Sequence, residues 1–180
     1  MDVEVFEKFF SMLGVIAGLG ALLLVAARFL RHRLVPAANA VELFGAYRLP
    51  VAALVATVAM LGSLYFSEVA HFKPCRFCWI QRGFMYPLAV ALIVATIRKA
   101  DHWRRFLIPW AAVGLSVSTY HYLLEWFPEK LETNVCDVKV PCSAFPFRLW
   151  SFSTIALMAG CGFLFVISVL SLPLESRRAS

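Results

Sequence analysis

The sequence is 180 residues long, with 61% hydrophobic residues, 16% charged residues and a net charge of +6. Soluble domains average about 45–50% apolar and about 25% charged residues, and a fold of this size cannot keep such an apolar excess away from water. The excess also excludes a disordered chain, and the basic residues are scattered between apolar runs, so no nucleic-acid-binding stripe is present. The composition therefore indicates an integral membrane protein that lies in a lipid bilayer and binds no nucleic acid.

Uncharged runs predict five transmembrane helices. Four runs have the length of roughly 20 residues that a helix needs to cross a bilayer: Phe9–Ala27, Leu49–Ser67, Phe106–Leu124 and Leu149–Leu174. The fifth, Gly83–Ile97, reaches that length only if its helix begins near Phe77 and includes Arg82. We expect the first run to be a retained helix, because the residues before it are acidic where a signal peptide is basic.

The predicted fold class is therefore an all-α membrane protein, with a four-helix transmembrane bundle and one additional N-terminal transmembrane helix. The additional helix and a cytoplasmic loop occupy residues 1–48, the bundle with two outer loops occupies residues 49–174, and a short cytoplasmic tail occupies residues 175–180.

Lysine and arginine residues predict the direction of the helices. The basic clusters at 31–33, 98–99 and 104–105 fall on one side of the membrane if the N-terminus is outside. Such clusters stay in the cytoplasm. We therefore expect an N-out, C-in topology in a bacterial cytoplasmic (inner) membrane, with residues 68–78 and 125–148 on the periplasmic side.

Four of the five cysteines lie in these two outer loops: Cys75 and Cys78, then Cys136 and Cys142. The outer compartment is oxidising, and four cysteines permit three disulfide pairings. The first pair is a CxxC that leads into the third helix, where free backbone N–H groups and the helix dipole favour a thiolate on Cys78. The second pair would close a short ring that gains little stability, so both pairs indicate exchange of electrons. Static disulfides and a metal site are the alternatives.

Three polar residues lie close to the CxxC or to the membrane boundary. Arg82 is four residues beyond Cys78 and so lies one turn deeper on the same helix face. With Gln81 beside it, Arg82 could donate hydrogen bonds to a carbonyl oxygen of a lipid-soluble acceptor, or it could extend outward to lipid headgroups. His121, near the outer end of the fourth predicted helix, is open to the same two interpretations.

These residues lie in blocks that resemble the DsbB family of membrane thiol oxidases, especially its short-loop branch, called BdbC. The resemblance covers roughly residues 50–172 and follows the family order: GSLYFSE at 62–68, PCRFCWIQR at 74–82, MYP at 85–87, YHYLLE at 120–125, Pro128, Cys136, and Pro141-Cys142. A lone CxxC is weak evidence, whereas the CxxC followed by these blocks and a second pair is specific. The first predicted helix is an addition to the four helices of the family.

The resemblance implies an enzyme of disulfide bond formation, a protein-disulfide (thiol:quinone) oxidoreductase. Its cofactor would be a membrane quinone, either ubiquinone or menaquinone, and no metal is expected. Its partner would be a secreted thioredoxin-fold thiol oxidase of the DsbA or BdbD kind. Two other interpretations remain open: an enzyme similar to vitamin K epoxide reductase, and a structural membrane subunit with static disulfides.

The resemblance also implies a role for each candidate residue. Cys136 and Cys142 would reoxidise the partner, with Cys136 the sulfur attacked, and Cys75 would exchange with that pair. Cys78 would face the quinone. The remaining candidates would contact the quinone or lie near it: Arg82 on a ring oxygen, with Gln81 and His121 close by.

Overall fold

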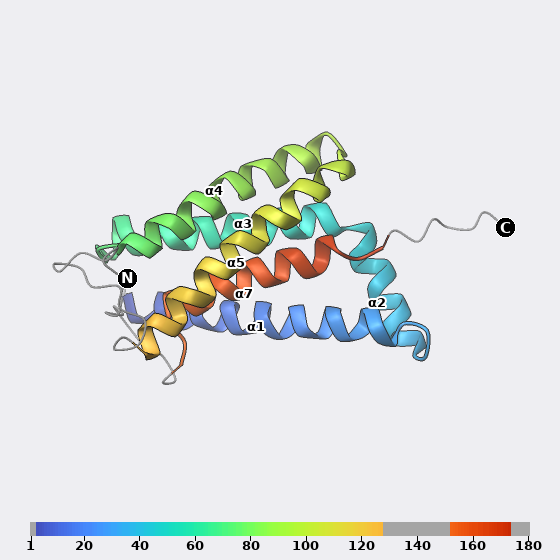
Figure 1. Cartoon of the computed structure of the whole chain (residues 1–180), viewed down its shortest axis with the longest axis horizontal. Coiled ribbons are helices and arrows are strands. Elements are labelled where there is room, and N and C mark those ends of the chain that lie inside the picture. The colour runs from blue at the N-terminus through green and yellow to red at the C-terminus, as the bar shows by residue number, and fades with distance from the viewer. Residues whose placement is uncertain (1–2, 128–151, 174–180) are drawn as a thin grey trace.

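The structure is a computed structural model, and it describes residues 3–127 and 152–173. All regular secondary structure in these two ranges is helical, and the long helices lie side by side (Figure 1). In chain order the elements are α1 (Val3–Leu30), α2 (Val35–Ala46), α3 (Arg48–Leu64), the π-helical turn η1 (Tyr65–Val69), α4 (Arg76–Ile97), the 3₁₀ turn η2 (Asp101–Trp103), α5 (Arg104–Trp126) and α7 (Ile155–Leu170).

Helix α7 is the centre of the bundle. It packs against α1, α5 and α3, while α4 packs against α3 and α5. The helices α1 and α4 both begin at one end of the bundle, which we call the cysteine end because α4 starts there after Cys75 (Figure 1). The opposite end, which carries α2 and η2, is called the far end.

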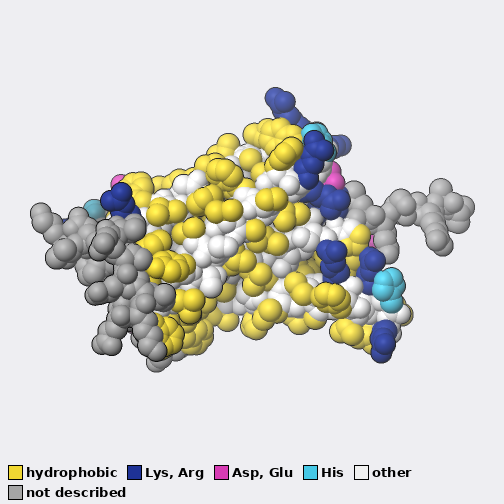
Figure 2. Space-filling model, in the orientation of Figure 1, with side chains coloured by type: hydrophobic (Ala, Val, Ile, Leu, Met, Phe, Trp, Pro, Cys, Tyr) yellow, Lys and Arg dark blue, Asp and Glu magenta, His cyan; other side chains and the backbone are white. Residues whose placement is uncertain are grey.

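The outer surface of the bundle suits a lipid environment. Three described segments are long and apolar enough to cross a membrane: α1, Arg48–Val69 (α3 with η1) and α4. Large apolar side chains point outward from them, with Phe29 78% and Ile97 75% exposed. Figure 2 shows hydrophobic side chains along the flanks. Such a continuous apolar surface is stable in hydrocarbon and not in water, so the predicted all-α membrane bundle is confirmed.

The number of spans remains a prediction, because the last two helices differ from the other three. Helix α5 has 23 residues, but its second half carries serine, threonine and histidine. Helix α7 is apolar but has only 16 residues, whereas the uncharged run predicts a helix over 149–174. The helix begins late because the Thr154 hydroxyl caps it, accepting from the Leu157 N–H at 3.3 Å, and Pro173 follows its end.

The sequence also predicts a loop where the structure has α2. Pro36 lies in the first turn of this helix, where its missing N–H is not needed, and alanines follow it. The helix packs closely at the far end: a Cβ on Gly45 would lie 2.7 Å from the Pro173 carbonyl oxygen. A 12-residue helix with few charges, placed between basic clusters, leaves no signal in a search for long uncharged runs.

A buried arginine holds the far end together. Arg48, at the start of α3, is 2% exposed, and in the sequence it is only one of several basic residues between the apolar runs. Its Nε donates to Asp101 Oδ1 at 2.7 Å, its Nη2 donates to Asp101 Oδ2, and its Nη1 donates to the Leu172 carbonyl at 2.7 Å. One side chain thereby joins α3, the α4–α5 connection and the chain after α7.

We expect Arg48→Met to destabilise the protein by about 3 kcal/mol, because Asp101 and the Leu172 carbonyl would lose a buried, charged donor. The Asp101 side chain is 35% exposed, so the expected loss of stability is at the lower end of the range for breaking a buried ion pair. Thermal unfolding in detergent measures the change. The matched control is Arg98→Met, which removes an exposed arginine at the end of α4 and should change stability by less than about 0.5 kcal/mol. Equal shifts in both variants would contradict the prediction.

Candidate active site

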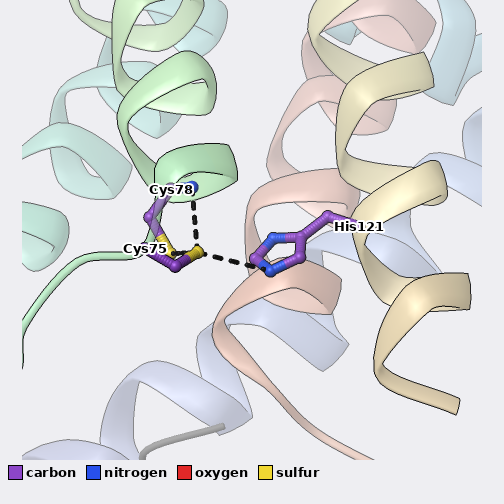
Figure 3. Close-up of side chains that lie close together, drawn as sticks. All are labelled: Cys75, Cys78 and His121. Atoms are coloured by element: carbon purple, nitrogen blue, oxygen red, sulfur yellow. Dashed lines mark hydrogen bonds between the residues drawn. The ribbon is translucent and has the colours of Figure 1, made fainter. Parts of the chain in front are cut away.

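The CxxC motif forms the start of α4, as the sequence predicts. Cys75 has an extended backbone and is the N-cap residue, and its sulfur accepts the backbone N–H of Cys78 at 3.3 Å. The sulfurs of Cys75 and Cys78 lie 2.8 Å apart. Figure 3 shows the two side chains next to each other at the start of the helix. Both are free thiols within reach of a disulfide bond.

The structure places the sulfur of Cys75 against the helix start, whereas the sequence favours a thiolate on Cys78, which stays a prediction. An N-cap side chain turns back over the free N–H groups of the first turn, as the Cys75 sulfur does toward the Cys78 N–H. The pKa of Cys75 is lowered to about 4, chiefly because the Cys78 thiol donates a hydrogen bond to it. Burial opposes this and raises the pKa, while the hydrogen bond from His121 lowers it further.

His121, from α5, faces Cys75 from the side opposite Cys78 (Figure 3). The ring is 2% exposed, and its Nε2 lies 3.5 Å from the Cys75 sulfur and 3.9 Å from Glu125 Oε1. The Gln81 amide nitrogen is 3.2 Å from Nδ1. The Phe77 ring stacks on the imidazole, with the two ring centroids 5.5 Å apart. Because Gln81 donates to Nδ1, the proton of the neutral ring lies on Nε2, where it can be donated to the Cys75 thiolate.

We expect the Cys75 thiolate of the reduced protein to persist to low pH and to be protonated only as the pH falls through about 4. His121→Phe keeps a flat ring against Phe77 but removes the donor, so the titration midpoint should move upward. The measurement is ultraviolet thiolate absorbance against pH, with the spectrum of Cys75→Ser subtracted. A wild-type midpoint near the ordinary cysteine value of about 8.5 would contradict the arrangement.

Cys78 faces a different environment from Cys75. It lines a cavity of about 510 Å³ between α1, α3, α4 and α7. The polar groups of the lining lie on α3, on α4 or on the segment between them, and the remaining surface is apolar. Of the four candidates in α4 and α5, Cys78, Gln81 and Arg82 line this cavity, whereas His121 lies behind Gln81 and beside Cys75.

Arg82 lies inside α4, as the short length of the uncharged run Gly83–Ile97 predicts. Its side chain turns toward α3. Its Nε donates to the Ser63 hydroxyl at 3.0 Å, and its Nη2 donates to the Ser63 carbonyl at 2.9 Å. The Trp79 ring lies 5.2 Å from the guanidinium carbon, and Tyr86 donates to the Ser63 hydroxyl at 3.4 Å. The guanidinium is thus held at the cavity wall, which favours a ligand in the cavity over a contact with lipid headgroups.

Sequence reasoning did not single out Ser63 and Glu125, although both lie in blocks that resemble the DsbB family. Ser63 orients Arg82, and Glu125 lies beside His121. The other cysteine pair, Cys136 and Cys142, lies outside the described residues, so its pairing and its approach to Cys75 remain predictions.

The described site also contains the donor atoms for a soft metal ion. One ligand atom each from Cys75, Cys78 and His121 lies within 4.8 Å of the others. Thiolates and imidazole are zinc ligands, and three protein ligands are the number found at catalytic zinc. The low thiolate pKa of Cys75 and the cavity beside Cys78 favour thiol–disulfide chemistry for the same atoms.

A helical membrane bundle with an activated dithiol at a helix start defines a membrane thiol oxidoreductase. The family profile "Disulfide bond formation protein DsbB" matches residues 47–176. The chain therefore belongs to the DsbB family, and it is a membrane protein of disulfide bond formation.

Curated relatives support this family membership over most of their own length. The chain is 40% identical over 114 residues to disulfide bond formation protein C of Bacillus subtilis, covering 63% of this chain and 83% of that protein. It is 38% identical over 135 residues to a probable disulfide formation protein of Deinococcus radiodurans, covering 70% and 88%. A probable disulfide formation protein of Oceanobacillus iheyensis is 39% identical over 127 residues, covering 69% and 88%. No solved structure matches the chain.

Proposed function

We propose that this protein is a thiol:quinone oxidoreductase that reoxidises a secreted thioredoxin-fold thiol oxidase. The observation that carries the proposal is the opposite placement of the two CxxC sulfurs. Cys78 lines an apolar cavity that also holds Arg82, whereas Cys75 contacts the buried His121. A dithiol with one sulfur exposed to an apolar cavity suits electron transfer to an acceptor that is soluble in the membrane.

The proposed electron path has two thiol–disulfide exchanges before the acceptor. The partner's two thiols reduce the Cys136–Cys142 disulfide, with Cys136 the sulfur attacked, and the partner leaves with its disulfide restored. The Cys136 and Cys142 thiols then reduce the Cys75–Cys78 disulfide and close again. Each exchange transfers two electrons and proceeds through a thiolate. A cysteine of the loop pair attacks Cys75 and Cys78 leaves; when the loop pair closes, Cys75 leaves in turn, and its low pKa makes it a good leaving sulfur.

The cavity fits a quinone by its chemistry, since it combines a guanidinium and a hydroxyl with a long apolar lining. A quinone bound there would supply the acceptor for the two electrons and two protons that the Cys75–Cys78 dithiol gives up, and would leave as the quinol. Arg82, held by Ser63, would donate hydrogen bonds to a ring oxygen, and the Cys78 sulfur lies on the same wall. As the Cys75–Cys78 disulfide re-forms, His121 holds a proton at Nε2 beside Cys75, with Gln81 orienting the ring.

The proposal places the cysteine end on the periplasmic side of a bacterial cytoplasmic membrane. Figure 2 shows most of the visible Lys and Arg side chains at the far end, which suits a cytoplasmic location. The first residues of α1 and the CxxC would then share the oxidising compartment, where the partner oxidase is found.

Anaerobic mixing of the purified protein with a reduced DsbA-type oxidase and either ubiquinone or menaquinone tests the proposal. Quinone absorbance should fall by one quinone for each partner disulfide formed, and Cys161→Ala, which removes the thiol in α7, should behave as the wild type. If neither quinone is reduced and both cysteine pairs resist a physiological thiol buffer, the disulfides are static and the proposal is wrong.

A further inference from the structure

The additional N-terminal helix forms one wall of the cavity that reaches Cys78. Residues from one face of α1 line it: Phe10, Leu13, Gly14, Ile16, Ala17 and Gly20. Helix α1 lies entirely outside the stretch that matches the family, residues 47–176. This wall is therefore a feature of the chain that family membership does not supply.

Close contacts hold α1 in this position. A Cβ on Gly14 would lie 2.8 Å from the Met158 side chain, and one on Gly18 would lie 2.9 Å from the Cys161 sulfur, so these α7 side chains pack directly against the α1 backbone. At the cysteine end α1 reaches across to η1, where the Phe6 and Tyr65 rings stack at 4.2 Å. These contacts place α1 on the bundle as a fixed element of the cavity.

The α1 wall differs in chemistry from the wall opposite. Every lining residue that α1 contributes is apolar, whereas Cys78, Arg82 and Ser63 come from α4 and α3. From Phe10 to Gly20 the α1 wall spans eleven residues, a rise of about 15 Å along the helix, and the cavity continues to Phe44 of α2. A ring head held at Arg82 would leave most of this length for an apolar chain.

We propose that α1 binds the isoprenoid tail of the quinone, and that Leu13 and Ala17 determine which tails the enzyme accepts. This inference rests on the proposed quinone reductase function. The ring head contacts α3 and α4, and the tail lies along α1 toward the far end. In this arrangement α1 closes a groove that would otherwise open to the bilayer, so it selects the acceptor by the tail and leaves the chemistry at Cys78 unchanged.

The test compares two matched pairs of variants in α1. Ala17→Phe fills the cavity and Ala26→Phe adds the same ring at an exposed position on the same helix. Leu13→Ala removes apolar contact from the cavity and Leu19→Ala does so on the exposed face, where Leu19 is 57% exposed. Ala17→Phe and Leu13→Ala should each raise KM for a long-tailed quinone by about tenfold or more, with a smaller change for a quinone whose tail is truncated. Their controls should match the wild type.

A second readout does not depend on turnover. An azido-quinone with a full-length tail, photolysed on the oxidised protein, should label peptides of α1, and Ala17→Phe should abolish that label while Ala26→Phe retains it.

If label appears only on α3 and α4 and both pairs of variants match their controls in KM, the α1 wall holds a lipid acyl chain and the inference is wrong, while the proposed function stands. If the wild-type protein reduces no quinone, both proposals are wrong. Leu13→Ala adds no volume, so it gives a result even if Ala17→Phe does not fold.

Discussion

Replacing Cys78 with serine is expected to abolish quinone reduction, lowering turnover by a factor of about a thousand or more, as the loss of a reacting nucleophile does in other enzymes. Serine cannot form a disulfide, so Cys75 has no sulfur with which to complete a two-electron transfer. Anaerobic quinone absorbance with a reduced partner oxidase measures the loss. Because Cys75 remains an activated thiol, the variant should also accumulate a mixed disulfide between Cys75 and a cysteine of the second pair.

The control for this variant is Cys161→Ser, which makes the same change in α7, away from the dithiol. It should retain wild-type turnover and form no mixed disulfide with Cys75. Full activity of Cys78→Ser would rule out the proposed path, because electrons would then reach the acceptor without the Cys75–Cys78 disulfide.

Replacing Arg82 with alanine is expected to raise KM for quinone about tenfold to a hundredfold, with a smaller effect on kcat. The variant loses a charged hydrogen-bond donor at the cavity wall, and a hydrogen bond to a charged group contributes about 1.5–3 kcal/mol. Ser63→Ala removes the hydroxyl that orients the guanidinium, at 3.0 Å from Nε, and should raise KM in the same direction but less. Steady-state kinetics at varied quinone concentration separates the two parameters.

Arg105→Met is the matched control for Arg82, since it removes an exposed arginine at the far end, in the first turn of α5. Its KM should equal that of the wild type. An unchanged KM in Arg82→Ala would mean that the guanidinium only fastens α4 to α3, and the ring oxygen of the acceptor would then need another donor.

Much of the architecture could be predicted from the sequence because the membrane imposes a simple rule on helix length. Uncharged runs locate α1, α3 and α4, and the one run that is too short predicts Arg82 inside its helix. The same rule fails for α2, which is short, and for the ends of α7, where a threonine cap and a proline set the boundaries. Boundaries of this kind depend on local hydrogen bonds that a count of apolar residues does not detect.

The sequence by itself determined that this is a helical membrane protein, where its dithiol lies, and which residues to consider around it. Only the tertiary structure decided that the Cys75 sulfur contacts His121, that Cys78 opens on the cavity, and that α1 closes that cavity. These features depend on His121, Ser63 and Ala17, which are distant from the CxxC in sequence and meet it only when α1, α3, α4 and α5 pack around α7. The apolar pattern of a helix indicates that it enters the membrane, but not which neighbour each of its faces contacts there.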